Sequence, residues 1–188
     1  MKSFVRYINF LIKAKFIFEL PKSSEVLLYD SYKRFTDDIF CYLDKKNCTE
    51  FFIRGQEINI PIFLRSLLSL KFFDFKRNYI LKYIQFVSPK IVITFTDNDM
   101  VYYTLKDNFK NKIIFIVMQN GLRGNYDNFE SFKNYKANSK YSLVVDYFLT
   151  VSQPISKKYK KYIKAKYIPI GLFRNNLVKK QKTIYKKR

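Results

Sequence analysis

The chain has 188 residues, of which 36 are Lys or Arg and 15 are Asp or Glu, and its formal net charge is +21. It contains no histidine, which excludes a Ser-His-Asp or Cys-His nucleophilic site and any histidine-ligated metal. The length suits a single domain, and no apolar run approaches the ~20 residues that cross a bilayer.

The excess positive charge is concentrated at the two ends of the chain. Residues 157–188 contain thirteen Lys or Arg and no acid, whereas residues 25–156 are nearly balanced. We expect a Rossmann-like domain over residues 25–172, preceded by an amphipathic helix and lead-in at 1–24 and followed by a basic linker or tail at 173–188. The apolar face of that helix can pack on the domain or lie on an anionic membrane surface.

Six apolar segments predict buried strands, and helix-length segments separate nearly all of them. The strands are expected at residues 25–30, 49–54, 90–95, 112–118, 144–151 and 166–170. Because their apolar character is continuous, both faces should be covered, as in a parallel sheet. The pattern predicts a doubly wound α/β fold, a mainly parallel, Rossmann-like sheet of about six strands with helices on both faces.

The segments between these strands predict helices, with one exception. We expect helices at 31–46, two within 60–87 with a break near 71–74, one that begins near Asn98 or Asp99, and one from Ser152 to about Lys164. In the first of these, Phe35, Ile39, Tyr42 and Leu43 should form the inner face. The exception is 125–141, which is rich in Asn, Lys, Ser and Tyr, shows little periodicity and predicts a long loop.

Ligands of such sheets bind beyond the carboxyl ends of the strands, and one polar cluster there is Asp97-Asn98-Asp99. It allows three interpretations. The two carboxylates could hold a divalent ion against a diphosphate. The three side chains could instead face a cleft and bind sugar hydroxyls. The third interpretation is that Asn98 or Asp99 only caps the next helix.

The second cluster follows the next strand and comprises Gln119, Asn120, Gly121 and Arg123. Asn-Gly favours a left-handed turn that exposes backbone N–H groups, and Arg123 can bind a phosphate or carboxylate with two hydrogen bonds. The cluster is therefore either a pocket for a polar ligand or an ordinary turn.

The sequence gives little indication of a cysteine-based site or of a glycine-rich phosphate-binding loop. Cys41 and Cys48 lack metal-type spacing and no secretory signal precedes them, so we expect reduced thiols in the cytoplasm. Neither Gly-x-Gly-x-x-Gly nor the Walker lysine loop occurs, which argues against a self-sufficient dinucleotide enzyme or P-loop ATPase. We predict no cofactor and no resident metal.

The segments EVLLYD, ITFTDND, FIVMQNGLRG, DYFLTVS and YIPIGLFRNN, taken in order, resemble the amino-terminal half of a GT-B glycosyltransferase. The resemblance covers roughly residues 20–178 and is closest to bacterial surface-carbohydrate biosynthesis transferases. It implies an acceptor-binding domain whose interdomain cleft is lined by both polar clusters. The nucleotide-sugar donor would bind a second Rossmann domain. Because LVKKQKTIYKKR stands where that domain would begin, we expect this chain to be incomplete as a catalyst: a truncated product, a fragment or one subunit of a split enzyme.

Three functional hypotheses follow. The first is an acceptor-side transferase domain for surface polysaccharide, with a glycan or lipid-linked acceptor, a donor held by a second domain or subunit, and peripheral contact with the anionic inner face of the cell membrane. The second is a non-catalytic basic module that binds nucleic acid or an anionic membrane, although a solvated charge run is the simpler interpretation of the tail. The third is a metal-dependent single-domain transferase that uses Asp97 and Asp99.

Overall fold

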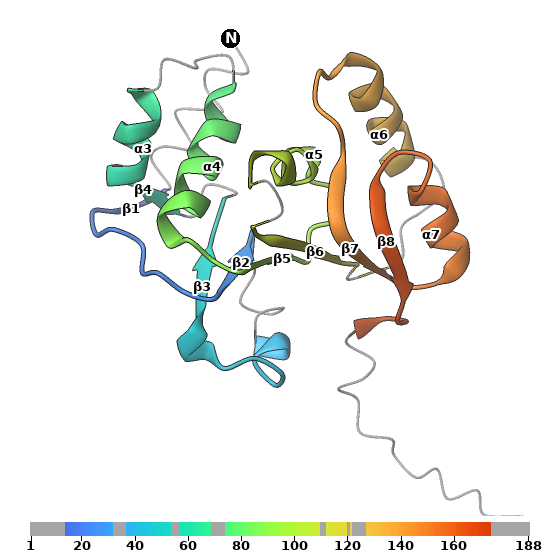
Figure 1. Cartoon of the computed structure of the whole chain (residues 1–188), viewed down its shortest axis with the longest axis horizontal. Coiled ribbons are helices and arrows are strands. Elements are labelled where there is room, and N and C mark those ends of the chain that lie inside the picture. Colours follow the sequence, from blue (N-terminus) through green and yellow to red (C-terminus); the bar gives the residue numbers. More distant parts are fainter. Residues whose placement is uncertain are drawn as a thin grey trace, which may run out of the picture.

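The computed structural model describes residues 14–31, 37–53, 57–68, 74–109, 112–119, 121 and 127–173. Six strands form one parallel sheet with the order β3-β2-β5-β6-β7-β8 (Figure 1). Their bounds are β2 Val26–Tyr29, β3 Cys48–Phe51, β5 Ile91–Thr94, β6 Ile114–Met118, β7 Val144–Thr150 and β8 Lys164–Pro169. All six predicted strands are present, and the predicted α/β fold with a parallel sheet is confirmed.

The two faces of the sheet are covered unequally. One face carries α3 (Ile60–Leu67), α4 (Phe75–Val87), α5 (Met100–Tyr103), α6 (Asp127–Asn138) and α7 (Gln153–Tyr159). In Figure 1, α3, α4 and α5 lie above the sheet, and α6 and α7 lie beside β7 and β8. Buried residues from this helix layer and the sheet form the larger core cluster. On the other face a smaller cluster forms around Ile39, Ile93 and Phe173. The helix layer therefore supplies most of the buried apolar contact.

The strand order reverses between β2 and β5. The chain leaves β2 to form β3 on one side and then returns past β2 to form β5 on its other side. Tyr29 at the end of β2 is level with Phe51 of β3 and Thr94 of β5. Loops that leave neighbouring strands at such a switch point diverge and leave a crevice beyond the strand ends. The fold thus places a crevice beside Tyr29.

A second, two-stranded sheet corrects the prediction for the amino-terminal segment. β1 (Lys15–Ile17) pairs in parallel with β4 (Glu57–Asn59), so residues 15–17 are extended and do not belong to an amphipathic helix. Residues 1–13 lie outside the described part of the chain. The prediction failed here because a parallel pair between segments about forty residues apart leaves no periodic signal in either one. The Asn59 side chain stabilises the ribbon by donating to the Glu19 carbonyl at 2.7 Å.

The prediction of a long loop at 125–141 is wrong, because Asp127–Asn138 forms α6. Three aromatic side chains at three-residue spacing pack on the core, those of Phe129, Phe132 and Tyr135, and Phe132 is fully buried. The remaining positions of the helix are mostly Asn, Lys, Ser and Glu. The apolar stripe is therefore narrow and entirely aromatic, which explains why the segment reads as polar and aperiodic.

Several predicted helices differ in length from the structure. α3 and α4 occur within residues 60–87 as predicted, although residues 71–73 of the predicted break lie outside the described residues. α4 ends at Val87 and is capped by Ser88, whose φ of 53° is left-handed. The helix expected from Asp99 is the short α5 followed by a 3₁₀ helix, η3 (Lys106–Phe109). α7 stops at Tyr159, short of Lys164, because β8 already begins there.

The helix expected at 31–46 is described only in part. Residues 37–39 are helical, and the 3₁₀ helix η1 (Lys45–Asn47) follows. Ile39 is buried as predicted, but Tyr42 is exposed and does not belong to the inner face. Phe35 and residues 174–188 of the tail lie outside the described residues. No helix in the described ranges is long and apolar enough to span a membrane.

The packing of α6 can be tested with Phe132→Ala. Its ring makes edge-to-face contacts with Tyr103 and Tyr159, so the substitution should lower the free energy of unfolding by about 3–5 kcal/mol in a urea titration. Phe18→Ala, at a ring that is 74% exposed, is the matched control and should change it by less than about 0.5 kcal/mol. Equal effects of the two substitutions would contradict the helix assignment.

Candidate functional site: a cavity at the switch point

A cavity of about 250 Å³ lies at the carboxyl ends of β2, β3 and β5. It is lined by Asp30, Ile53, Lys76, Thr96, Asn98 and Asp99. These residues come from three strand ends and from the first turn of α4. The cavity therefore occupies the crevice that the strand order creates. We name it the switch-point cavity.

The chain turns out of β2 at Asp30, and this turn places Asp30 in the wall of the cavity. Its φ of 52° is left-handed, a conformation that Asp tolerates better than bulkier residues. Its backbone N–H donates to the Phe51 carbonyl at 2.8 Å, so the turn is tied to the end of β3. The next residue, Ser31, is also buried, and its Oγ has no hydrogen-bond partner within the described part of the chain. A strained backbone beside a buried polar group is typical of functional sites.

Asp99 is held in place from three directions. Its Oδ1 accepts from the Val101 N–H at 3.1 Å and caps α5, as the sequence allowed. Its Oδ2 accepts from the Tyr29 hydroxyl at 2.7 Å. Burial, and then the charge of Asp99, raise the pKa of Tyr29 well above its usual range, so the phenol stays protonated and remains a donor. Lys76 Nζ lies 3.9 Å from Oδ1 and is itself exposed, so it can reach a ligand in the cavity.

Asp97 points away from the cavity. It is fully buried, its Oδ2 accepts from the Tyr159 hydroxyl at 2.8 Å, and its carbonyl accepts from the Tyr103 hydroxyl at 2.8 Å. Burial, and then the charge of Asp97, raise the pKa of Tyr103 well above its usual range. Asp97 and Asp99 therefore have different partners on different elements. Among the described residues no group of three or more His, Cys, Asp or Glu is placed to hold a metal ion.

The second polar cluster lies at the end of β6. Gln119 is buried, its Nε2 donates to the Gly121 carbonyl at 3.0 Å, and its Oε1 accepts from the Val151 N–H at 3.0 Å. Gln119 thus fastens the end of β6 to the end of β7. Gly121 has open space around it, while Asn120 and Arg123 lie outside the described residues. The described members of this cluster do not line the switch-point cavity.

Five of the seven residues predicted for the site are described, and two of these five line the cavity, Asn98 and Asp99. Sequence reasoning missed Lys76, Ile53 and Thr96 as members of the site. Asp30 could have been identified from the sequence, since it is a carboxylate at the end of a buried strand. Lys76 could not have been identified from the sequence, because only the packing of α4 on the sheet brings it to the cavity.

One comparison with known proteins bears on this chain. Residues 114–188 match a family model described as "putative O-antigen biosynthesis protein". The match begins at β6 and includes the Gln119 turn, but it does not include the switch-point cavity. No curated protein and no solved structure matches the chain. The match supports a role in surface carbohydrate biosynthesis.

The buried Asp97 carboxylate should be a main support of the cavity wall. Tyr159→Phe removes one of its donors and should lower the free energy of unfolding by about 1.5–3 kcal/mol, the usual contribution of a hydrogen bond to a charged group. Tyr42→Phe, which removes a hydroxyl from an exposed ring, should leave stability almost unchanged. Thermal and urea unfolding of both variants measure the difference, and equal stabilities would show that this bond contributes little.

Proposed function

We propose that this chain is the acceptor-side domain of a glycosyltransferase, or glycosyl-phosphate transferase, that builds a bacterial surface polysaccharide. The acceptor sugar binds in the switch-point cavity. The observation that carries this proposal is the cavity itself, which joins charged and amide side chains at a switch point. The family match at residues 114–188 supports the same biological role.

The side chains of the cavity suit a hydroxyl-rich ligand. Each sugar hydroxyl both donates and accepts a hydrogen bond, so a site for it needs groups of both kinds. Asp30 and Asp99 bring carboxylate oxygens that accept, and Lys76 brings an ammonium that donates. The exposed Asn98 amide can do either. Ile53 gives the cavity an apolar wall against which the C–H groups of a sugar ring can pack.

The nucleotide-sugar donor binds, in this proposal, on a second domain or subunit. The sequence contains neither of the two glycine-rich phosphate-binding motifs considered above. In the described part of the chain, the cavity also brings together two carboxylates and one lysine, a poor setting for a diphosphate. We therefore assign the acceptor, and not the donor, to this cavity.

A location at the inner face of the cell membrane accords with the charge of the chain. Basic residues near an anionic leaflet contribute about 1 kcal/mol each to binding, and the net charge is +21. Such an attraction would bring the domain close to an acceptor carried on a lipid. It would also weaken as salt is added.

The proposal predicts that Asn98→Ala and Lys76→Met weaken sugar binding at least about tenfold, because each removes a hydrogen-bonding group from the cavity. Saturation-transfer NMR and calorimetry with defined O-antigen mono- and oligosaccharides measure the affinity. Lys133→Met, at an exposed lysine of α6, makes the same charge change elsewhere and should have no effect.

The same titrations repeated across a salt series separate this function from a basic binding module. Binding of a neutral glycan should change little with salt, whereas binding of nucleic acid or anionic vesicles falls steeply. If the wild-type chain binds no sugar, or if both cavity variants bind as well as it does, the proposed function is wrong.

A further inference from the structure

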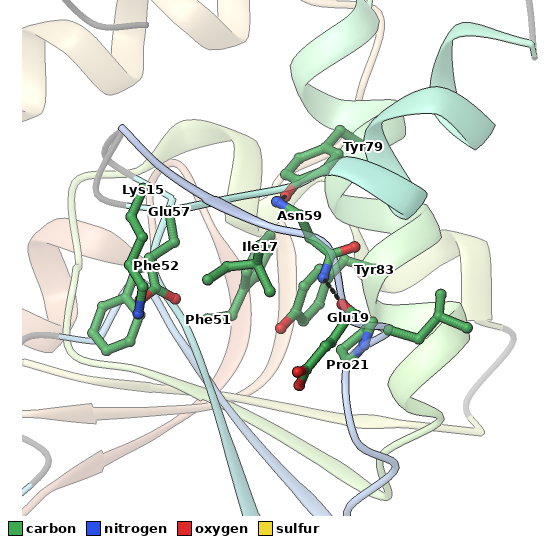
Figure 2. Close-up of a pocket in the computed structure, with 11 residues that line it drawn as sticks. Lys15, Ile17, Glu19, Pro21, Phe51, Phe52, Glu57, Asn59, Tyr79 and Tyr83 are labelled. Atoms are coloured by element: carbon green, nitrogen blue, oxygen red, sulfur yellow. Dashed lines mark hydrogen bonds and ion pairs between the residues drawn. The ribbon is translucent and has the colours of Figure 1, made fainter. Parts of the chain in front are cut away.

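A second cavity, of about 220 Å³, opens at the edge of the main sheet (Figure 2). We name it the ribbon cleft, because the β1–β4 ribbon forms one wall and the end of β3 and α4 form the others. Its lining includes the charged residues Lys15, Glu19 and Glu57 and the aromatic residues Phe52, Tyr79 and Tyr83. The volume is below the roughly 300–1,000 Å³ of sites for drug-sized ligands. It suits a single sugar ring.

Aromatic side chains form the inner wall of the ribbon cleft. The Tyr83 ring stacks on Phe51 with centroids 3.8 Å apart and an angle of 10° between the ring planes, which fixes its orientation. The Tyr79 hydroxyl accepts from the Asn59 N–H at 3.0 Å and is likewise fixed. Burial raises the pKa of Tyr83 well above its usual range, so its hydroxyl keeps its proton. These two tyrosines provide a rigid aromatic surface that carries phenol groups, and the half-buried Phe52 also lines the cleft.

Carboxylates dominate the rim of the ribbon cleft. Glu57 pairs with Lys15 at 3.5 Å across the ribbon. Asn59 holds the backbone of Glu19 through the 2.7 Å bond to its carbonyl, drawn as a dashed line in Figure 2, while the Glu19 side chain stays exposed. Among the described residues, two of the three charged side chains that line the cleft are therefore acidic, in a chain whose net charge is +21. Such a rim repels phosphate and accepts hydrogen bonds from hydroxyl groups.

One helix connects the ribbon cleft to the switch-point cavity. Lys76 of α4 lines the cavity, and Tyr79 and Tyr83 of the same helix line the cleft. These three residues are at i, i+3 and i+7, and so lie on one face of the helix. Seven residues of helix span on the order of 10 Å. The end of β3 also borders both sites, because Phe52 lines the cleft and Ile53 lines the cavity.

We propose that the ribbon cleft is a second saccharide subsite. The acceptor is accordingly an oligosaccharide of at least two sugars that lies along α4, with one ring in the switch-point cavity and the next in the ribbon cleft. The inference rests on the proposed function, since it names the substrate class of the same binding surface. The ring in the cleft packs its C–H face on the aromatic wall, donates hydroxyl protons to Glu19 and accepts a hydrogen bond from the Tyr83 hydroxyl.

The test measures the affinity of the full chain for defined O-antigen mono-, di- and trisaccharides by calorimetry and saturation-transfer NMR. Glu19→Gln and Tyr83→Phe are the cleft variants, because both preserve side-chain shape and should fold. Each should weaken binding of di- and trisaccharides about tenfold, the effect of one lost hydrogen bond to a charged or buried group. Monosaccharide binding, which needs only the switch-point cavity, should be unchanged. Glu130→Gln on α6, at an exposed carboxylate, is the matched control and should change neither.

The outcomes separate this inference from the proposed function. If the cleft variants bind every sugar as the wild type does while Asn98→Ala still binds weakly, the second subsite is wrong and the proposed function stands. If the cleft variants weaken monosaccharide binding and Asn98→Ala does not, the two-subsite arrangement is wrong and the acceptor site lies in the cleft alone. If no sugar binds the wild-type chain, both ideas fail together.

Discussion

Burial of the Asp97 carboxylate at the end of the central strand β5 is the constraint on which the switch-point cavity depends. A buried charge must be hydrogen-bonded, and Asp97 accepts from Tyr159 of α7 while its carbonyl accepts from Tyr103 of α5. Both bonds draw the loop after β5 toward the helix layer. The loop then turns Asn98 and Asp99 toward the start of α4, where they line the cavity together with Lys76. A structural carboxylate thus positions its neighbours, and its own oxygens stay out of reach of a ligand.

A similar arrangement recurs at the bulge in β7. Asp146 pairs with Lys106 of η3 and accepts from the Phe115 N–H of β6 at 2.9 Å, where the register between β7 and β8 shifts. The Asp146 carboxylate joins β7 and β6 to the short helical segment between β5 and β6, whereas the Asp97 carboxylate joins the loop after β5 to α7. Asp99 differs from both, because its side chain is fixed yet borders open space. That difference distinguishes the functional candidate from carboxylates that only hold the fold together.

The fold could be predicted from the sequence where local patterns decide it. Continuous apolar runs such as 91–94 and 114–118 are typical of strands in a sheet that is covered on both faces. These runs therefore predicted both the strands and their parallel arrangement. The ribbon and α6 could not be predicted in the same way. β1 exists because a distant segment, β4, pairs with it, and α6 exists because the Phe132 stripe is buried by α5 and α7.

The sequence predicted where the site lies, but not which side chains form it. The strand-end rule located Asp97, Asn98 and Asp99, but spacing says nothing about which side chain faces the crevice. That choice is made by Tyr29 and Tyr159, which are distant in sequence and carry no motif.

The distribution of acidic residues favours an oligosaccharide over a nucleotide as the ligand of this surface. The chain has 36 basic and 15 acidic residues, so a random surface of it would present mainly lysine. The switch-point cavity and the ribbon cleft nevertheless bring together Asp30, Asp99, Glu19 and Glu57. Carboxylates repel a diphosphate but bind vicinal hydroxyls well, and the aromatic wall between the ribbon and α4 adds the apolar surface that a sugar ring needs.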